Sequence, residues 1–261
     1  MMELLRILDK RQRALRAALS LHLPGRPDIV DPASFGGRRV IVVGPAETVF
    51  EDLEGTSVDD YDVVVRLNNG MSLAEGRPDV LGHRTDILVH NLREVGPRNA
   101  GAIPAPDLKA KGVKTVICPN WGSSDLRRRY RAKRAALAAI DGPPLLVLPP
   151  DFMMRLRSDL EGRAPTVGIS IASFFLDCAV AELAIHGFTF FETRYAESYN
   201  DAVRTALDAR NWVDAAGAHE PKSEKALLRR RLEQPDCPPV TLGAKVRFHL
   251  MERAAPAEGR T

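Results

Sequence analysis

The sequence contains only three cysteines in 261 residues, at positions 118, 178 and 237. Their spacing fits neither a disulfide framework nor a set of metal ligands, so we expect a reducing compartment. The chain also lacks an apolar run of the roughly 18 to 20 residues that a bilayer crossing needs, and its beginning lacks a clean apolar signal core. These absences predict a cytoplasmic protein without a membrane-spanning helix.

A strong excess of one charge is also missing, because 37 Lys and Arg residues stand against 34 Asp and Glu residues, a net charge of +3. This excess is too small to indicate a nucleic-acid partner. The densest basic run covers residues 127–134, and we interpret it as the solvated face of a helix. The alternative is that it grips an anionic acceptor or a lipid headgroup.

Residues 2–22 carry leucines and alanines between basic side chains, a pattern typical of an amphipathic helix with a basic face. We expect this helix to pack on the domain or on a second subunit. The alternative is peripheral attachment to an anionic surface at the inner face of a membrane. The predicted organisation is a helix and linker over residues 1–35, one catalytic domain over 36–250 and a flexible tail over 251–261, with the oligomeric state left open.

Beyond the linker, short apolar runs alternate with helical patterns, which is typical of a parallel sheet with helices on both faces. The predicted strands are residues 39–43, 62–66, 86–90, 114–118, 145–148 and 184–189. The predicted helices are residues 122–139, 151–161, 168–182, 196–210 and 221–233. The sequence therefore predicts an α/β fold of one domain, with a Rossmann-like parallel sheet flanked by helices.

Two of the predicted strands end in polar loops that contain glycine. The apolar run 40–43 stops at Gly44, and the run 63–65 stops before Arg66 and Asn68. Ligands of open α/β sheets bind in the crevice at the carboxyl ends of the strands. We therefore expect Gly44, Arg66 and Asn68 to lie at one crevice.

Each polar side chain at this crevice also has a structural interpretation. Asn68 can hydrogen-bond a ribose or a phosphate, and the alternative is a turn-stabilising asparagine. For Arg66 we favour a structural role, in an ion pair with an acid such as Asp86.

A helix is predicted to begin where the loop at Thr166 turns into an apolar segment. Free backbone N–H groups at such a start bind phosphate or carboxylate, and Gly168 lets the backbone approach a ligand closely. The alternative is simple N-capping by Thr166.

A metal site has one candidate in the sequence, the pair Asp60 and Asp62, which has the Asp-x-Asp spelling of many nucleotide-sugar transferases. The pair precedes the second strand, so its carboxylates are expected at the wrong edge of the sheet and we predict no metal there. Most other histidines fall in or beside strands and are interpreted as structural. His90 is the exception, because together with Asn91 it follows the third strand and can face the crevice.

Three separated blocks resemble, in order and spacing, the motifs of glycosyltransferase family 29, the sialyltransferases. Together they cover roughly residues 38–235. The matching residues are Val43-Gly44, the acidic stretch 59–62, Arg66-Leu67-Asn68 and residues 79–86 in the first block, Pro165-Thr166-Val167-Gly168 and His186-Gly187-Phe188 in the second, and His219 with Glu224 in the third.

The resemblance implies the sialyltransferase variant of the GT-A fold and an inverting reaction that needs no metal and no other cofactor. It implies a CMP-activated acidic keto-sugar, sialic acid or 3-deoxy-manno-octulosonate (Kdo), as donor, and a glycan or glycolipid as acceptor. A base tuned near neutral pH is most simply a histidine, and the resemblance gives that role to His219, with Glu224 as a second catalytic residue. The nucleotide-binding residues that it implies are Gly44, Pro45, Asn68, Asn69, Thr166, Val167, Gly168, Ser170 and Tyr199.

His219 also suits a purely structural position at a helix start. Pro221 fits a first helical turn, and Glu224 can reach back to a backbone N–H there. The two interpretations are compatible, because a capped helix start would also hold the imidazole in place.

The chain departs from the family pattern in two blocks, which leaves other functions open. Residues 45–47 replace the usual Asn-Ser-Gly, and residues 195–200 retain little of the aromatic, His-containing motif. Val40 stands where animal members have a cysteine, so the disulfide of the family is absent. One alternative is a CMP-binding or scaffolding module with a decayed site. Another is an NAD-dependent enzyme, but residues 44–49 lack the Gly-x-Gly-x-x-Gly turn that such an enzyme needs.

Overall fold

The computed structural model describes residues 26–96, 99–103, 105–200, 202–215 and 217–251. Its centre is one sheet of eight strands in the order β1-β6-β5-β4-β3-β2-β7-β8, and every neighbouring pair is parallel. The strands are β1 (Asp28–Ile29), β2 (Arg39–Val43), β3 (Val63–Leu67), β4 (Ile87–Val89), β5 (Thr115–Cys118), β6 (Leu145–Val147), β7 (Glu182–His186) and β8 (Val240–Leu242). The predicted Rossmann-like α/β fold is confirmed.

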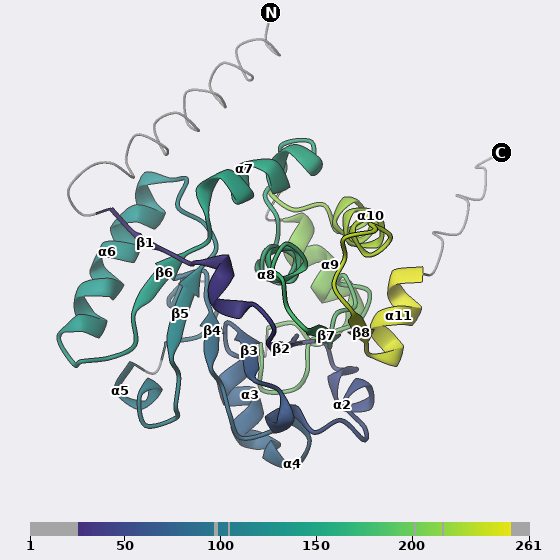
Figure 1. Cartoon of the computed structure of the whole chain (residues 1–261), viewed down its shortest axis with the longest axis horizontal. Coiled ribbons are helices and arrows are strands. Elements are labelled where there is room, and N and C mark those ends of the chain that lie inside the picture. The colour runs from purple at the N-terminus through teal and green to yellow at the C-terminus, as the bar shows by residue number, and fades with distance from the viewer. Residues whose placement is uncertain (1–25, 97–98, 104, 201, 216, 252–261) are drawn as a thin grey trace, which may run out of the picture.

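Helices cover both faces of this sheet (Figure 1). One face carries α7 (Pro150–Asp159), α8 (Val167–Leu176), α10 (Pro221–Leu232) and α11 (Ala244–Met251). The other face carries α2 (Val49–Asp52), α3 (Gly70–Gly76), α4 (Pro78–Leu81), α5 (Ala105–Leu108) and α6 (Ser124–Ala138). The remaining helix, α9 (Ala206–Asp214), follows a long loop after β7, and two 3-10 turns lie at Pro32–Phe35 and Val58–Asp60.

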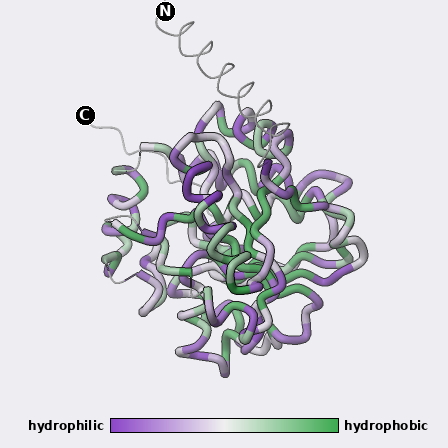
Figure 2. Tube along the Cα trace, turned by 90° about the vertical axis from the view of Figure 1, so that its left-hand side faces the viewer, coloured by the Kyte–Doolittle hydropathy of each residue, from purple (hydrophilic) through white to green (hydrophobic). Residues whose placement is uncertain are grey.

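Alternating residues of each central strand supply the two halves of the core. In β2, Val40 and Val42 pack under α8, whereas Ile41 and Val43 pack against the layer of α2 to α4. Because the sheet is covered on both faces, its strands read as continuous apolar runs, and they are strongly hydrophobic in Figure 2. This explains why the central strands are visible in the sequence.

The side of the sheet on which successive strands are added changes at β2, and the site lies near this point. From β2 the chain adds β3, β4, β5 and β6 on one side, and it then returns to add β7 and β8 on the other. The helix after β2 and the helix before β7 lie on opposite faces of the sheet. The loops that follow β2 and β7 are joined by backbone hydrogen bonds, from the Ala46 N–H to the Gly187 carbonyl and from the Glu47 N–H to the Arg194 carbonyl, both at 3.1 Å. The cavity opens beside them at the carboxyl edge of the sheet, the usual ligand position in such folds.

The predicted strands and most predicted helices are confirmed to within about two residues at their starts, and the differences have local causes. β7 ends at His186 rather than at residue 189, because Gly187 turns the chain at a φ of +72°. The helix predicted over 196–210 is wrong: residues 194–199 form a loop, and α9 begins at Ala206 after a capping box of Thr205 and Asp208. The short β1, β8, α2 to α5 and α11 were not predicted.

Residues 28–35, placed in the linker by their composition, belong to the sheet domain. β1 pairs with β6, and Phe35 makes an edge-to-face contact with Phe175 at a centroid distance of 5.0 Å. The helix predicted over residues 2–22 and residues 252–261 of the predicted tail lie outside the described residues. None of the helices in the described part of the chain is long and apolar enough to cross a bilayer.

Candidate active site

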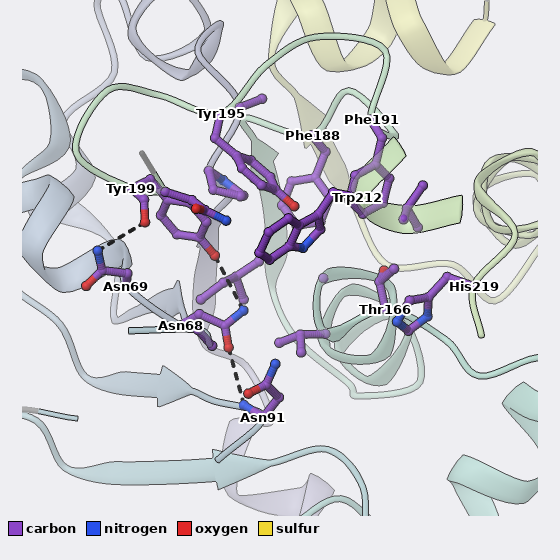
Figure 3. Close-up of a pocket in the computed structure, with 18 of the residues that line it drawn as sticks. Asn68, Asn69, Asn91, Thr166, Phe188, Phe191, Tyr195, Tyr199, Trp212 and His219 are labelled. Carbon is purple, nitrogen blue, oxygen red and sulfur yellow. Dashed lines mark hydrogen bonds between the residues drawn. The ribbon is translucent and has the colours of Figure 1, made fainter. Parts of the chain in front are cut away.

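A cavity of about 620 Å³ opens at the carboxyl ends of the strands. Its walls come from the loops that follow β2, β3, β4, β5 and β7, from the start of α8 and from α9 (Figure 3). Of the eleven predicted site residues, nine line it: Pro45, Asn68, Asn69, Thr166, Val167, Gly168, Tyr199, His219 and Glu224. Segments far apart in the sequence therefore meet in one concave site, but of Gly44, Arg66 and Asn68, which were expected at one crevice, only Asn68 lines it.

The two asparagines after β3 connect strand ends to the loop of residues 194–199. Asn68, at a φ of +49°, donates from Nδ2 to the Tyr199 hydroxyl at 3.4 Å and accepts from the Asn91 backbone N–H at 3.3 Å (Figure 3). Asn69 donates from Nδ2 to the carbonyl oxygens of Ser198 and Tyr199, at 3.2 and 3.1 Å. Both side chains thus bind protein groups and fix the position of Tyr199.

Aromatic side chains form one wall of the cavity. The rings of Tyr195 and Tyr199 lie 5.1 Å apart between centroids and are tilted by 56°, and Phe188, Phe191 and Trp212 lie beside them (Figure 3). Burial raises the pKa of the Tyr199 phenol to about 12. The hydroxyl therefore keeps its proton at neutral pH and can serve as a hydrogen-bond donor, while the rings offer flat apolar surface to a planar base.

The start of α8 faces the aromatic wall. Thr166 is its N-cap, and its Oγ accepts from the Ile169 N–H at 3.3 Å. The N–H groups of Val167 and Gly168, in the first turn, have no acceptor inside the helix, as in any α-helix. Both residues line the cavity, so this helix start can bind an anion there. The predicted residue Ser170 is fully buried and donates to the Thr166 carbonyl at 2.8 Å, so it is not part of the lining.

Gly44 and Gly168 both lie against the ring of Phe188, which leaves no room for a side chain at either position. A Cβ atom on Gly168 would lie 2.6 Å from the Phe188 ring, and one on Gly44 would lie 2.6 Å from that ring and 2.3 Å from the Gly187 carbonyl oxygen. Gly44 does not line the cavity. Its role, and part of that of Gly168, is to leave room for the ring of Phe188, which lines the cavity.

His219 is held by the loop that enters α8. Its Nδ1 lies 2.7 Å from the Ala164 carbonyl oxygen. Since a carbonyl can only accept, Nδ1 carries the hydrogen, and in the neutral ring the lone pair is on Nε2. The imidazole lines the cavity near Thr166 (Figure 3), so it has the tautomer of a base.

Glu224 joins the start of α10 to the start of α8. Its Oε1 accepts from the Thr166 N–H at 2.6 Å and its Oε2 accepts from the Thr166 hydroxyl at 2.8 Å. Glu224 does not reach back to its own helix start; it is 2% exposed, and burial raises its pKa to about 7. The carboxyl group thus fixes the predicted phosphate-binding turn relative to the segment that carries His219.

His90, the second candidate base, does not face the crevice. It is fully buried; Nδ1 accepts from the Leu92 N–H at 2.9 Å, so Nε2 donates to the Gly101 carbonyl at 3.1 Å. Burial lowers its pKa to about 4. His90 is therefore a neutral structural histidine, and the expectation that it faces the crevice is wrong.

Arg66 is structural, as predicted, but its partner is not Asp86. The guanidinium is 1% exposed and donates to Thr85 Oγ at 3.0 Å and to the backbone carbonyls of residues 81, 82 and 84. Asp86 instead pairs with Arg84 at 3.0 Å and with Lys114 at 2.7 Å. A buried guanidinium can be satisfied by carbonyl oxygens, which sequence spacing does not reveal.

The Asp60 and Asp62 pair lies at the opposite edge of the sheet from the cavity, before β3. Asp62 accepts from the Arg39 backbone N–H at 2.8 Å. Within the described ranges, no group of three or more His, Cys, Asp or Glu side chains is placed to hold a metal ion. Asp62 therefore contributes a hydrogen bond at the amino ends of the strands, and neither aspartate lines the cavity.

The basic run 127–134 lies on α6, away from the cavity lining. Several of its cations are paired: Arg128 and Arg129 with Asp125, Lys133 with Glu94 and Arg134 with Asp28. These pairs favour the interpretation as an ordinary helix face.

The sequence analysis missed Arg93 and Asn120 in the lining, whereas Asn91, which it placed with His90 after the third strand, does line the cavity. Asn91 and Asn120 stand two residues beyond the ends of β4 and β5. The signal that could have found Asn120 is the rule already applied to β2 and β3, that the first polar residues after a parallel strand face the crevice.

The comparisons with known proteins agree on one family. The sequence model of glycosyltransferase family 29 (sialyltransferase) matches residues 7–234. The rat (Rattus norvegicus) CMP-N-acetylneuraminate-beta-1,4-galactoside alpha-2,3-sialyltransferase is 25% identical over 219 residues, which are 74% of this chain and 54% of that protein. The chain thus spans about half the length of this curated relative.

Two solved structures share the fold. One is a mammalian sialyltransferase in complex with Gal-beta-1-3GalNAc-ortho-nitrophenol, with a TM-score of 0.50 and 17% identity over 90% of this chain and 78% of that chain. The other is a variant of the sialyltransferase Cst-II from Campylobacter jejuni in complex with CMP, with a TM-score of 0.53 and 13% identity over 84% of this chain and 89% of that chain.

Proposed function

The chain belongs to glycosyltransferase family 29, the sialyltransferases, and on this premise we propose that it transfers an acidic keto-sugar from a CMP donor to an acceptor hydroxyl. The sugar is sialic acid or Kdo, and the acceptor is a glycan or a glycolipid. The observation that carries the proposal is one cavity lined together by a helix start, an aromatic wall and a histidine of defined tautomer.

The donor is proposed to bind in one orientation, with its base at the aromatic wall and its phosphate at the start of α8. The cytosine packs against the aromatic wall of Tyr195 and Tyr199, and the phosphate accepts hydrogen bonds from the first turn of α8. The helix start offers partial positive charge, which offsets the phosphate without a metal ion. The CMP of the related Cst-II complex supports this choice of nucleotide.

The transfer then needs one proton acceptor and one leaving group. The acceptor oxygen bonds to the anomeric carbon as its proton passes to Nε2 of His219, and the bond from that carbon to the CMP phosphate oxygen breaks. Attack from the side opposite the phosphate inverts the configuration. The Ala164 carbonyl keeps the proton of the ring on Nδ1, so that Nε2 is the basic nitrogen.

We further propose that the protein acts in the cytoplasm. The basic amphipathic segment over residues 2–22 packs on the domain or on a second subunit, or alternatively attaches the protein to the inner face of a membrane. Lipid-linked acceptors would be concentrated there. This part of the proposal is tested by sedimentation with anionic liposomes, and a full-length protein that ignores them at low salt would remove it.

Ligand binding tests the donor. CMP should raise the melting temperature equally with and without a chelator, whereas UDP and NAD should not raise it, because only a ligand of the folded state stabilises it. Release of CMP from CMP-sialic acid or CMP-Kdo, in the presence of glycan acceptors, then tests transfer. Selective stabilisation by NAD would contradict the CMP site. Stabilisation by CMP with no turnover of either donor would indicate a binding module.

A further inference from the structure

A second, smaller cavity adjoins the cavity of the candidate active site. Its volume of about 330 Å³ lies within the range of roughly 300 to 1,000 Å³ that is usual for ligand pockets. Phe190, Phe191 and Val213 belong to the lining of both cavities. The concave site therefore continues beyond the part that the proposed donor occupies.

The second cavity lies next to the proposed base. Glu220 and Pro221, which follow His219 directly in the chain, line it at the start of α10. Asp214, the last residue of α9, lines it as well. In the proposed reaction the acceptor hydroxyl lies at Nε2 of His219 while the donor fills the first cavity, so the rest of the acceptor must leave this point on another side. The second cavity provides such a side.

The turn between the two cavities has an unusual backbone. Phe190 and Phe191 adopt φ angles of +52° and +63°, which residues with bulky side chains rarely adopt. The next residue, Glu192, fixes this turn to α10 and α11, because its carboxylate accepts from Lys225 Nζ at 2.9 Å and from His249 Nδ1 at 2.7 Å. Such a strained backbone persists only where the surrounding contacts maintain it, and it is frequent at ligand sites.

This turn places the ring of Phe191 at the junction of the two cavities. Phe190 is buried in the core, whereas Phe191 is half-buried. The Phe191 ring lies 6.3 Å from the Tyr195 ring between centroids, at the end of the aromatic wall that lies toward His219 in Figure 3. Its exposed surface is apolar and can pack against the C–H face of a sugar ring.

The lining of the second cavity carries charges of both signs in equal number. The cations are Arg210, Lys222 and Lys225, and the anions are Glu192, Asp214 and Glu220. Lys225 and Glu192 pair with each other, and within the described part of the chain the other four side chains have no hydrogen-bond or ion-pair partner. A sugar hydroxyl both donates and accepts, so it can bind to groups of either sign, whereas a carboxylate or a phosphate would also meet unpaired acids. The cavity therefore suits a neutral sugar.

We propose that the second cavity is an acceptor subsite for a neutral sugar, the one next to the sugar that carries the reacting hydroxyl. This sugar packs on Phe191, and its hydroxyls form hydrogen bonds with Arg210 and Asp214. The proposal rests on the proposed function, because it assigns a part of the acceptor in the same reaction. It predicts that the protein acts on oligosaccharides of at least two sugars in preference to monosaccharides.

A panel of paired acceptors tests this preference in the wild type. It pairs the methyl glycosides of galactose, glucose and mannose with neutral disaccharides that end in the same sugars, and with disaccharides whose second sugar is a uronic acid. At least one neutral disaccharide should be used with a kcat/KM about tenfold above that of its monosaccharide. Equal use of both members of every pair, a preference for the uronic acid, or transfer to none of the panel overturns the subsite.

The variant that tests the cavity is Arg210→Ala with Asp214→Ala, which removes two exposed side chains of α9 and keeps the net charge. Its matched control is Arg155→Ala with Asp151→Ala on α7, a pair of the same spacing outside both cavities. In the test variant the KM for the preferred disaccharide should rise about tenfold, whereas the KM for the monosaccharide and the affinity for CMP should change less than about twofold. Lys222→Ala, on α10, should raise the same KM in the same direction, and it provides the test if the α9 variant melts below the control.

The outcomes separate the subsite from the proposed function. If the test variant uses the disaccharide as the control variant does, the subsite is wrong while the proposed function stands. An equal rise in KM for both members of the pair also overturns the subsite, because the effect would then lie at the reacting sugar. A wild-type protein that does not bind CMP overturns both proposals.

Discussion

The two edges of the same sheet are built from different chemistry. At the amino ends of the strands, charged side chains satisfy one another: Arg39 pairs with Glu182, and Asp86 pairs with Arg84 and Lys114. At the carboxyl ends, the cavity is lined mainly by amides, aromatic rings and the open start of α8. In this molecule the clustered charges therefore stabilise the fold at one edge of the sheet, whereas neutral polar residues that follow the strands mark the candidate site at the other edge.

The largest effect is expected at the carboxyl edge. His219→Ala should lower turnover about 10²- to 10⁴-fold, the usual contribution of a positioned base, and should change CMP affinity little. Because His219 precedes a helix, the melting temperature must stay near that of the wild type before the loss is assigned to chemistry.

His83→Ala is the matched control, since His83 is an exposed histidine at the amino edge. It should retain full turnover. A folded His219→Ala protein that turns over at the wild-type rate would remove His219 from the mechanism.

At the amino edge the expected loss is of stability. Asp86→Ala leaves the Val64 N–H, which donates to Asp86 at 2.8 Å, without its acceptor and breaks two ion pairs. The free energy of unfolding should fall by about 1–3 kcal/mol, as for other unsatisfied buried groups. CMP affinity, measured well below the melting temperature, should be unchanged.

Lys114→Ala removes only an exposed partner of the same carboxylate, so it should cost less than about 1 kcal/mol. A large loss of CMP affinity in Asp86→Ala would contradict the separation of the two edges.

Glu224 is the exception at the carboxyl edge, because it is a buried acid, and it predicts a pH effect. Burial raises its pKa from 4.5 to about 7, so the fold favours the protonated form. Its contribution to stability is therefore greatest below about pH 4.5 and is lost as the pH rises through 7. Glu224→Gln keeps a side-chain oxygen that accepts from Thr166. Because an amide does not ionise, this variant should not lose stability as the pH rises through 7.

The stability of the wild type relative to Glu224→Gln should consequently fall between pH 5 and pH 8, by on the order of 3 kcal/mol at most. Denaturant unfolding at a series of pH values measures it. Parallel pH profiles of the two proteins would show that Glu224 does not titrate in this range.

The smallest effect is expected for the Asp-x-Asp pair. Asp60→Asn with Asp62→Asn keeps the side-chain oxygen that accepts from Arg39 and removes both charges. CMP affinity should change less than about twofold, with Mn²⁺ or with a chelator, because the pair lies far from the cavity. Loss of a Mn²⁺-dependent gain in CMP affinity in this variant would show that the pair binds metal.

The sequence predicted the parts of the molecule that depend on local pattern. The buried strands were visible because both faces of the sheet are covered, and the start of α8 was visible because Thr166 and Gly168 precede an apolar helix. The motif resemblance supplied His219. The bond between Asn120 and Arg157, which joins positions 37 residues apart, could not be predicted, because it depends on how α7 packs on the sheet.

Predictions from local sequence pattern were wrong where hydrogen bonds between distant residues determine the backbone conformation. Residues 196–200 have helical composition, yet they stay in a loop because Asn69 donates to the carbonyls of Ser198 and Tyr199 and the Ala196 N–H donates to the Pro45 carbonyl. The partner of Arg66 was wrong for a related reason, since carbonyl oxygens replaced the expected carboxylate.

The ring of Phe188 lies against two glycines that are 124 positions apart, but only one of them depends on that ring alone. A Cβ on Gly168 meets only side chains, the nearest being Phe188, so Phe188→Leu should act as a suppressor of Gly168→Ala. A Cβ on Gly44 also meets the backbone oxygen of Gly187, so no change at Phe188 can rescue Gly44→Ala. We therefore expect residues 168 and 188 to change together in evolution, and residue 44 to stay glycine.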